Sequence, residues 1–130
     1  MEYIQFVLAP QMINGLAIGV AVILMALGLT IIFGLLDVIN MSHGEFYAMG
    51  AFLGLSLGAL GFGFWALCVL VPLLMLPIGF VVERTMIQTV FHHKDRHILT
   101  LLLTFGLALI LEDVFKIIYG PNPLRPPLPV

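Results

Sequence analysis

The densest group of polar side chains lies at residues 37–45 (DVINMSHGE), between two long apolar stretches. An amide, a hydroxyl, an imidazole and a carboxylate crowd into six positions there: Asn40, Ser42, His43 and Glu45. Ser42 and Glu45 have the spacing of a capping box, in which both side chains satisfy backbone N–H groups at a helix start. The alternative hypothesis is that Asn40, His43 and Glu45 contact a polar solute or a partner subunit, because ionisable groups at membrane depth are functional candidates.

A second charged group interrupts the last apolar stretch. Glu112 and Lys116 are four residues apart in the favourable order for a helical ion pair, and Asp113 and Lys116 are three apart. A proton or ion relay is one interpretation of this cluster. The other is an ion-paired cluster whose side chains reach toward the outward-facing surface of the bilayer that the helix crosses.

The third polar group could suggest a metal site, because histidine and carboxylate are zinc ligands. Its members are His92, His93, Asp95 and His97, and their spacing matches no strong metal motif. A haem or quinone site in a helix bundle needs inward-facing ligands from facing helices, and only His43 lies near an expected span. The sequence shows no nucleophile–base arrangement, phosphate-cradling loop or paired catalytic carboxylates. We therefore predict no catalytic residue, no metal, no cofactor and no enzymatic activity.

The composition places these groups in a membrane protein. The chain has 130 residues, of which 62% are hydrophobic and 9% are charged. Soluble domains have about 45–50% apolar and about 25% charged residues. This excludes a soluble monomer, a disordered chain and a nucleic-acid partner, which would require a basic surface.

The positions of the charges divide the chain into helices that could cross a bilayer. A span needs about 20 mostly apolar residues, and the turn signal Gly61-Phe62-Gly63 splits an uncharged stretch that is too long for one span. We expect an all-α, multi-pass transmembrane helix bundle with about four spans, the second alternatively re-entrant. The spans are predicted near residues 11–36, 45–60, 64–82 and 98–119, with Pro10 just ahead of the first helix and Tyr3 as an interfacial anchor.

Lysine and arginine predict the orientation. The loop at residues 83–97 contains Arg84, Lys94 and Arg96, so the positive-inside rule places it in the cytoplasm. The N-terminus and the proline-rich tail at 120–130 would then face outward, and a re-entrant second segment would reverse the N-terminus. Within the loop, either a short helix on the membrane surface or an ordinary polar connector is expected.

Glycines recur at four-residue spacing in two of the expected helices. Small residues at this spacing let helix backbones approach closely, so we expect these faces to pack against other helices. The positions are Gly15, Gly19, Gly50, Gly54 and Gly58.

Three stretches together resemble a known family. They are residues 14–52, which contain ALGLT-x-IFG and IN-x-x-HGEFY-x-x-GA, the Glu83-Arg84 pair, and residues 101–123, which contain TFGL-x-LILED. They resemble the permease subunits of Liv-type ABC importers, which carry branched-chain amino acids and also urea and short amides. The candidates for the solute pathway or for subunit assembly are Asn40, Ser42, His43, Gly44, Glu45, Thr104, Phe105, Gly106 and Glu112, and all of them except Ser42 match positions of these motifs.

The resemblance implies a multi-pass protein of the bacterial inner membrane. Its partners would be the lipid bilayer, a second permease subunit, cytoplasmic ATP-binding subunits and a periplasmic solute-binding protein. Family members are about twice this long, so the chain is expected to be the N-terminal half of a permease, as a fragment, a split gene product or a truncated reading frame. The loop QTVFHHKDRH departs from the family pattern.

A rival interpretation remains open. The glycine faces could build a small self-associating membrane protein, such as an oligomeric channel or an assembly scaffold.

Overall fold

The computed structural model describes residues 4–122, which are helical apart from short connections and contain no strand. The chain divides after Asp37 into two compact units, and each unit is described by itself. The predicted all-helical fold class is confirmed. Tyr3 and the proline-rich residues 123–130 lie outside the described residues.

The first unit is one long helical run. A π-helical turn, η1 (Ile4–Leu8), leads without a break into α1 (Ala9–Leu36). The expectation that the helix starts after Pro10 is therefore wrong, because helical residues precede this proline. Pro10 is the second residue of α1, and it follows the π-helical turn within the same helical run.

A residue in the left-handed helical backbone conformation ends α1. Asp37 has φ 52° and ψ 38°, and its N–H donates to the carbonyl of Phe33 at 2.9 Å. A residue in this conformation just past a helix turns the chain out of the helical path and satisfies one of the last carbonyls. The aspartate that marks the end of the first apolar stretch thus also ends the helix.

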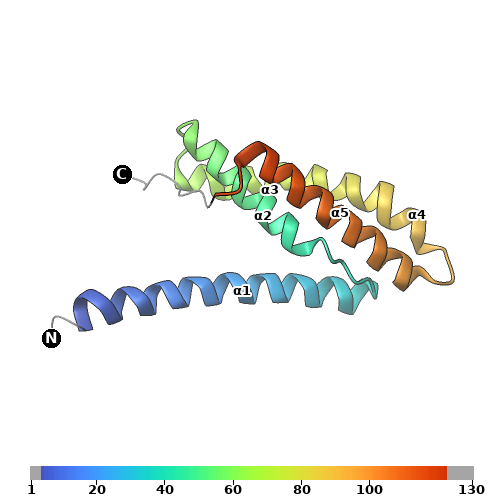
Figure 1. Cartoon of the computed structure of the whole chain (residues 1–130), viewed down its shortest axis with the longest axis horizontal. Helices are drawn as coiled ribbons and strands as arrows, with labels where there is room; N and C mark the ends of the chain where they lie inside the picture. Colours follow the sequence, from blue (N-terminus) through green and yellow to red (C-terminus); the bar gives the residue numbers. More distant parts are fainter. Residues whose placement is uncertain (1–3, 123–130) are drawn as a thin grey trace. The chain divides into compact units, whose positions relative to one another are not determined.

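The second unit contains α2 (His43–Ala59), α3 (Phe64–Val82), η2 (Glu83–Ile87), α4 (Gln88–Phe91) and α5 (Arg96–Tyr119) (Figure 1). The turn between α2 and α3 lies at the predicted Gly61-Phe62-Gly63, where Gly61 has a φ of 93° that favours glycine. Pro72 and Pro77 lie inside α3.

The predicted loop at 83–97 is mostly helix. Because α3, η2 and α4 follow one another without interruption, a single helical run extends over Phe64–Phe91. Residues 83–91 are thus helical, as the short-helix expectation had it, but they continue α3 instead of forming a separate helix, and residues 92–95 link this run to α5. The guanidinium of Arg96 lies 5.1 Å from the centre of the Phe91 ring across this connection.

Helix α2 uses opposite faces to contact α3 and α5. On one face, a Cβ built at Gly50 or Gly54 would lie 3.8 Å from Val71 of α3. Two residues further along, and so on the opposite side of the helix, Phe52 contacts Phe115 and Tyr119 of α5.

Helix α2 and its preceding turn run parallel to α5 in constant register. Met41 contacts Thr104, Phe52 contacts Phe115, and Ser56 contacts Tyr119. The two residues of each pair are 63 positions apart in the sequence. These contacts therefore hold a segment of about four helical turns along its whole length.

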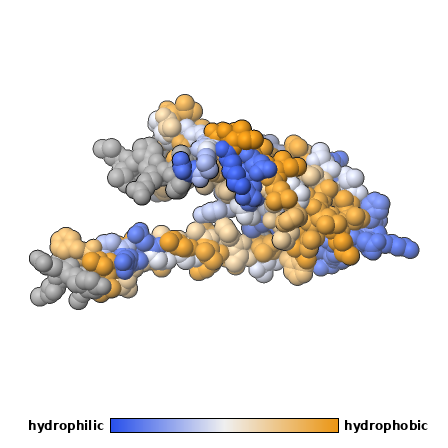
Figure 2. Space-filling model, viewed as in Figure 1, coloured by the Kyte–Doolittle hydropathy of each residue, from blue (hydrophilic) through white to orange (hydrophobic). Residues whose placement is uncertain are grey.

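Apolar side chains cover most of the surface of this unit (Figure 2). Hydrophilic residues gather in this view at the end where α4 and α5 meet. Counting both units, three helical runs within residues 4–122 are long and apolar enough to cross a membrane: Phe6–Leu36, Phe64–Phe91 and Arg96–Tyr119. Helix α2 has 17 residues, which is about the lower limit for a span.

Candidate functional site

The best-buried residues of the described chain surround a polar turn that we call the polar elbow, residues 38–42. Among the described residues, only four are buried, and three of them are polar. The buried residues are Val38, Ser42, Thr100 and Thr104. In a chain with so much exposed apolar surface, the packed centre is thus a hydroxyl-rich joint between the elbow and α5.

Asn40 organises the elbow from within. Its Oδ1 accepts the backbone N–H of Ser42 at 3.0 Å and the Ser42 hydroxyl at 2.6 Å. Ser42 is fully buried, so this hydroxyl needs a partner inside the protein. The side-chain carbonyl of Asn40 therefore fixes both the backbone and the side chain of Ser42, the residue that precedes α2.

The predicted capping box is wrong. Ser42 is the N-cap residue of α2, but its side chain makes no capping bond, because its hydroxyl donates to Asn40. The backbone carbonyl of Ser42 instead accepts the N–H groups of Glu45 at 3.0 Å and Phe46 at 3.1 Å.

Thr104 connects the elbow to α5. Its Oγ1 accepts the N–H of Met41 at 3.0 Å and lies 2.8 Å from the carbonyl of Thr100, to which it can donate. The carbonyl oxygen of Ile39 lies 3.4 Å from the same hydroxyl. One buried hydroxyl thus joins its own helix to a turn that is distant in sequence.

His43, Gly44 and Glu45 form the first turn of α2. The side chains of His43 and Glu45 are half-buried, and Gly44 is exposed. Glu45 complements the positive end of the helix dipole. The structure therefore places the HGE signature directly after the elbow, at the end of α2 that lies nearest Thr104.

The later signature continues along α5 on a different face. Thr104 is buried, whereas the neighbouring Phe105 is 49% exposed. Gly106 is half-buried, with no atom within 4 Å of an added Cβ. Of the residues in this signature, only Thr104 is hydrogen-bonded to the elbow.

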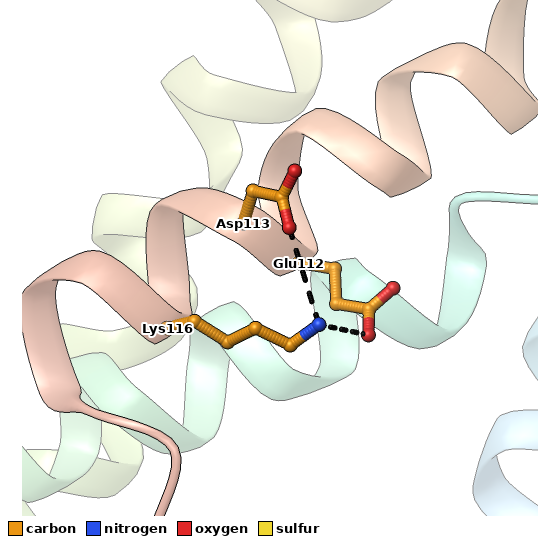
Figure 3. Close-up of polar contacts among 3 residues, drawn as sticks. All are labelled: Glu112, Asp113 and Lys116. Carbon is orange, nitrogen blue, oxygen red and sulfur yellow. Dashed lines mark hydrogen bonds and ion pairs between the residues drawn. The ribbon is translucent and has the colours of Figure 1, made fainter.

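Glu112, Asp113 and Lys116 form an exposed ionic cluster further along α5 (Figure 3). The Lys116 Nζ lies 2.7 Å from a Glu112 carboxylate oxygen and 3.9 Å from one of Asp113. The lysine is 53% exposed, and the two acids are 49% and 76% exposed. The cluster is thus paired within itself and open to whatever surrounds the helix.

Sequence reasoning missed the aromatic contact between α2 and α5. Phe52 stacks on Tyr119 with ring centres 4.3 Å apart, and it lies 5.1 Å from Phe115. The hydroxyls of Ser56 and Tyr119 are 2.8 Å apart. The spacing of four residues within each pair, Phe52 with Ser56 and Phe115 with Tyr119, is the signal that could have indicated two matching helix faces.

The glycines differ between the two units. A Cβ at Gly58 would lie 3.7 Å from Leu67, in line with the contacts of Gly50 and Gly54. Within the described residues, no atom lies within 4 Å of a Cβ added at Gly15 or Gly19 of α1. One face of α2 is therefore packed on α3.

The histidines of the α4–α5 connection do not assemble a metal site. Across residues 4–122, no three side chains of histidine, cysteine, aspartate or glutamate lie close enough to hold one ion. His92 and His93 are exposed.

Together, the long apolar helices and the buried polar joint define an all-helical membrane protein. The chain belongs to the family described as "Branched-chain amino acid transport system / permease component", whose model matches residues 11–126. It is therefore a membrane permease component of the branched-chain amino-acid transport family, which is a class of transport proteins rather than of enzymes.

Individual relatives agree with this family. The chain is 25% identical over 130 residues to the high-affinity branched-chain amino acid transport system permease protein LivH of Escherichia coli K12, covering 90% of this chain and 40% of LivH. It is 40% identical over 43 residues to BraD, the corresponding permease protein of Pseudomonas aeruginosa, covering 33% of this chain and 14% of BraD. The chain thus spans well under half the length of these relatives. No solved structure matches it significantly.

Proposed function

We propose that the chain forms the N-terminal part of a permease subunit in an ABC importer of the bacterial inner membrane. Its solutes are branched-chain amino acids or related small polar molecules such as urea and short amides. The family match over residues 11–126 carries this proposal, because it includes the elbow, all of α2 and α3, and all of α5. Solute crosses by alternating access between permease subunits, and this chain performs no bond chemistry.

The structure supports a role for the elbow in assembling the permease. Its backbone is fixed by Asn40 from within and by Thr104 from α5. These bonds set the position at which the half-buried His43 and Glu45 begin α2. We propose that this first turn contributes to the solute pathway or to a subunit contact.

The proposal also assigns partners and orientation. Cytoplasmic ATP-binding subunits supply the energy, a second permease subunit completes the pathway, and a periplasmic binding protein delivers the solute. The connection at residues 92–95 faces the cytoplasm, because Arg84, Lys94 and Arg96 lie on that side of the apolar helices.

Uptake in whole cells tests the proposal. Deletion of the locus that encodes the chain should abolish ATP-dependent uptake of labelled leucine, isoleucine and valine, and the intact locus should restore it. Uptake of lysine serves as the control and should not change. Parallel assays with labelled urea and acetamide distinguish the solute classes. Unchanged uptake of all these solutes would overturn the proposed function.

Purification from native membranes provides a second test. An ATPase and a solute-binding protein should copurify with the chain. The four-residue spacing of Gly15 and Gly19 in α1 is the basis for the alternative, a self-associating scaffold or channel. That alternative predicts a homo-oligomer and an ATP-independent solute leak in vesicles.

A further inference from the structure

The ionic cluster belongs to a continuous face of α5, which we call the outward stripe: Phe105, Leu109, Glu112 and Lys116. These residues follow one another at intervals of four, three and four, so they lie on one side of the helix. Each is about half exposed. Thr100 and Thr104, which face the elbow, are buried by contrast. The stripe therefore has the pattern of a helix-packing face.

The position of the charged residues along α5 indicates how deep they would lie in a membrane that this helix spans. Glu112 lies 16 residues after Arg96 and 7 before Tyr119 in α5, which corresponds to about 24 Å and about 10 Å along the axis. Tyr119 is level with Ser56, and α2 continues for three more residues to Ala59, about 5 Å further. A bilayer is about 40–45 Å thick with a hydrocarbon core of about 30 Å. In a bilayer that α5 crosses from Arg96 to Tyr119, Glu112 would therefore lie inside the hydrocarbon, about 10 Å from the end of the helix.

The cluster is not electrically balanced. Glu112 and Asp113 carry two negative charges, and Lys116 supplies one positive charge. Helix α1 has no charged residue, and the described cations Arg84, Lys94 and Arg96 belong to the opposite end of α5 or to the helix before it. Charged groups inside a membrane face protein or water rather than lipid and pair with opposite charges.

We propose that the outward stripe packs against a further transmembrane helix that carries a lysine or arginine level with Glu112 and Asp113. This helix is not among residues 4–122. The chain aligns with only 40% of LivH, so the remainder of such a permease has the length to supply it. The basic side chain balances the second carboxylate, while Phe105 and Leu109 pack against apolar residues of the same helix. The inference rests on the proposed function only in requiring insertion into a membrane with other permease segments.

Photo-crosslinking from Leu109 tests this contact. The chain is produced in its native membranes with benzoylphenylalanine in place of Leu109, illuminated and purified, and the attached peptide is identified by mass spectrometry. The expected adduct is with a long apolar segment that contains a lysine or arginine. Combining Glu112→Gln with Asp113→Asn should lower the yield at least about fivefold, because an interhelical polar contact is lost. Lys94→Gln, which removes a charge at the other end of α5, should leave the yield unchanged.

Several results would overturn the proposal. These are adducts with lipid alone, a crosslinked segment that lacks a basic residue, or a yield that does not respond to the paired acid substitutions. In a Cys68→Ser background, rapid labelling of Leu109→Cys by a membrane-impermeant maleimide would identify a water-filled path instead. Loss of the adduct in Arg125→Gln would mean that the tail of this chain supplies the charge. Thermal unfolding midpoints within about 2 °C of the parent would show that the variants remain folded.

The crosslink requires neither substrate nor ATP, so it fails or succeeds independently of transport. If the solute is taken up but no adduct forms, only the proposed contact of the outward stripe is overturned. If the adduct forms but no solute is taken up, only the proposed transport function is overturned.

Discussion

The backbone N–H of Met41 donates a 3.0 Å hydrogen bond to the hydroxyl of Thr104, a residue 63 positions later in the chain. Met41 lies in a turn, so its N–H has no regular helical partner to use instead. The bond brings together two of the three stretches by which the sequence resembles its family. It also makes the stability of the elbow depend on a single side chain of α5.

Replacing Thr104 with valine should destabilise the second unit by about 1–3 kcal/mol. Valine keeps the shape of the side chain, but it leaves the Met41 N–H without its acceptor. The free energy of unfolding can be measured by denaturant titration in detergent. Thr89→Val is the matched control, because Thr89 also bonds a carbonyl four residues earlier but is exposed. Its effect should stay within about 0.5 kcal/mol. Equal losses for the two variants would contradict the assigned role of Thr104.

Asn40 and Ser42 should show strong coupling in a double-mutant cycle. Asn40→Ala removes the oxygen that accepts both the N–H and the hydroxyl of Ser42. Ser42→Ala removes one of these donors, so the second substitution costs less once the first is present. We expect a coupling free energy of about 0.5–3 kcal/mol. Asn40→Asp retains an acceptor oxygen and should restore part of the stability. Additive losses would show that the two side chains act independently.

Gly54→Leu should destabilise the contact between α2 and α3 by about 1–3 kcal/mol relative to Gly79→Leu. A Cβ at Gly54 already reaches 3.8 Å from Val71, so the rest of a leucine side chain has no room. No atom lies within 4 Å of a Cβ at Gly79 within the described residues. Both substitutions gain helix propensity, so this contribution cancels in the comparison. Thermal unfolding in detergent measures the difference, and Gly54→Ala should be tolerated. A Gly54→Leu variant as stable as Gly79→Leu would contradict close packing.

Tyr119→Phe should cost about 0.5–1.5 kcal/mol, since it removes the hydroxyl bonded to Ser56 and keeps the ring stacked on Phe52. Tyr119→Leu removes the stacking as well and should cost at least about 0.5 kcal/mol more. Unfolding free energies of the two variants separate the two contributions. In a Ser56→Ala background, the change to phenylalanine should have little further effect. A full loss in that background would mean that the hydroxyl has another partner.

Much of the fold could be predicted because charges and glycines mark where helices end. Helix α3 covers the expected residues 64–82, and α5 begins two residues before the expected 98. The short helix expected within residues 83–97 is instead a continuation of α3, which the charges of Glu83 and Arg84 made harder to predict. Charged side chains do not interrupt a helix, and this one continues to Phe91.

The elbow shows why local spacing predicted the helix start but not its bonds. Ser42 and Glu45 match a capping box, yet the Ser42 hydroxyl is taken by an asparagine two residues earlier. The hydrogen-bond acceptor of the Met41 N–H was even harder to predict. Thr104 is one of several threonines in apolar surroundings, and only the packing of α2 along α5 selects it.

The two sides of α2 have different mechanical properties. Toward α5, hydrogen bonds at Thr104 and Tyr119 stand at the two ends of the contact, so sliding along this side would break both together. Toward α3, Gly50 and Gly54 have no side chains that could interlock with Val71, so this part of the contact resists sliding less. We therefore expect α2 and α5 to move together as one rigid body, and α3 to slide relative to them. Spin-label distances should stay fixed between α2 and α5 and change between α2 and α3 when transport conditions are varied.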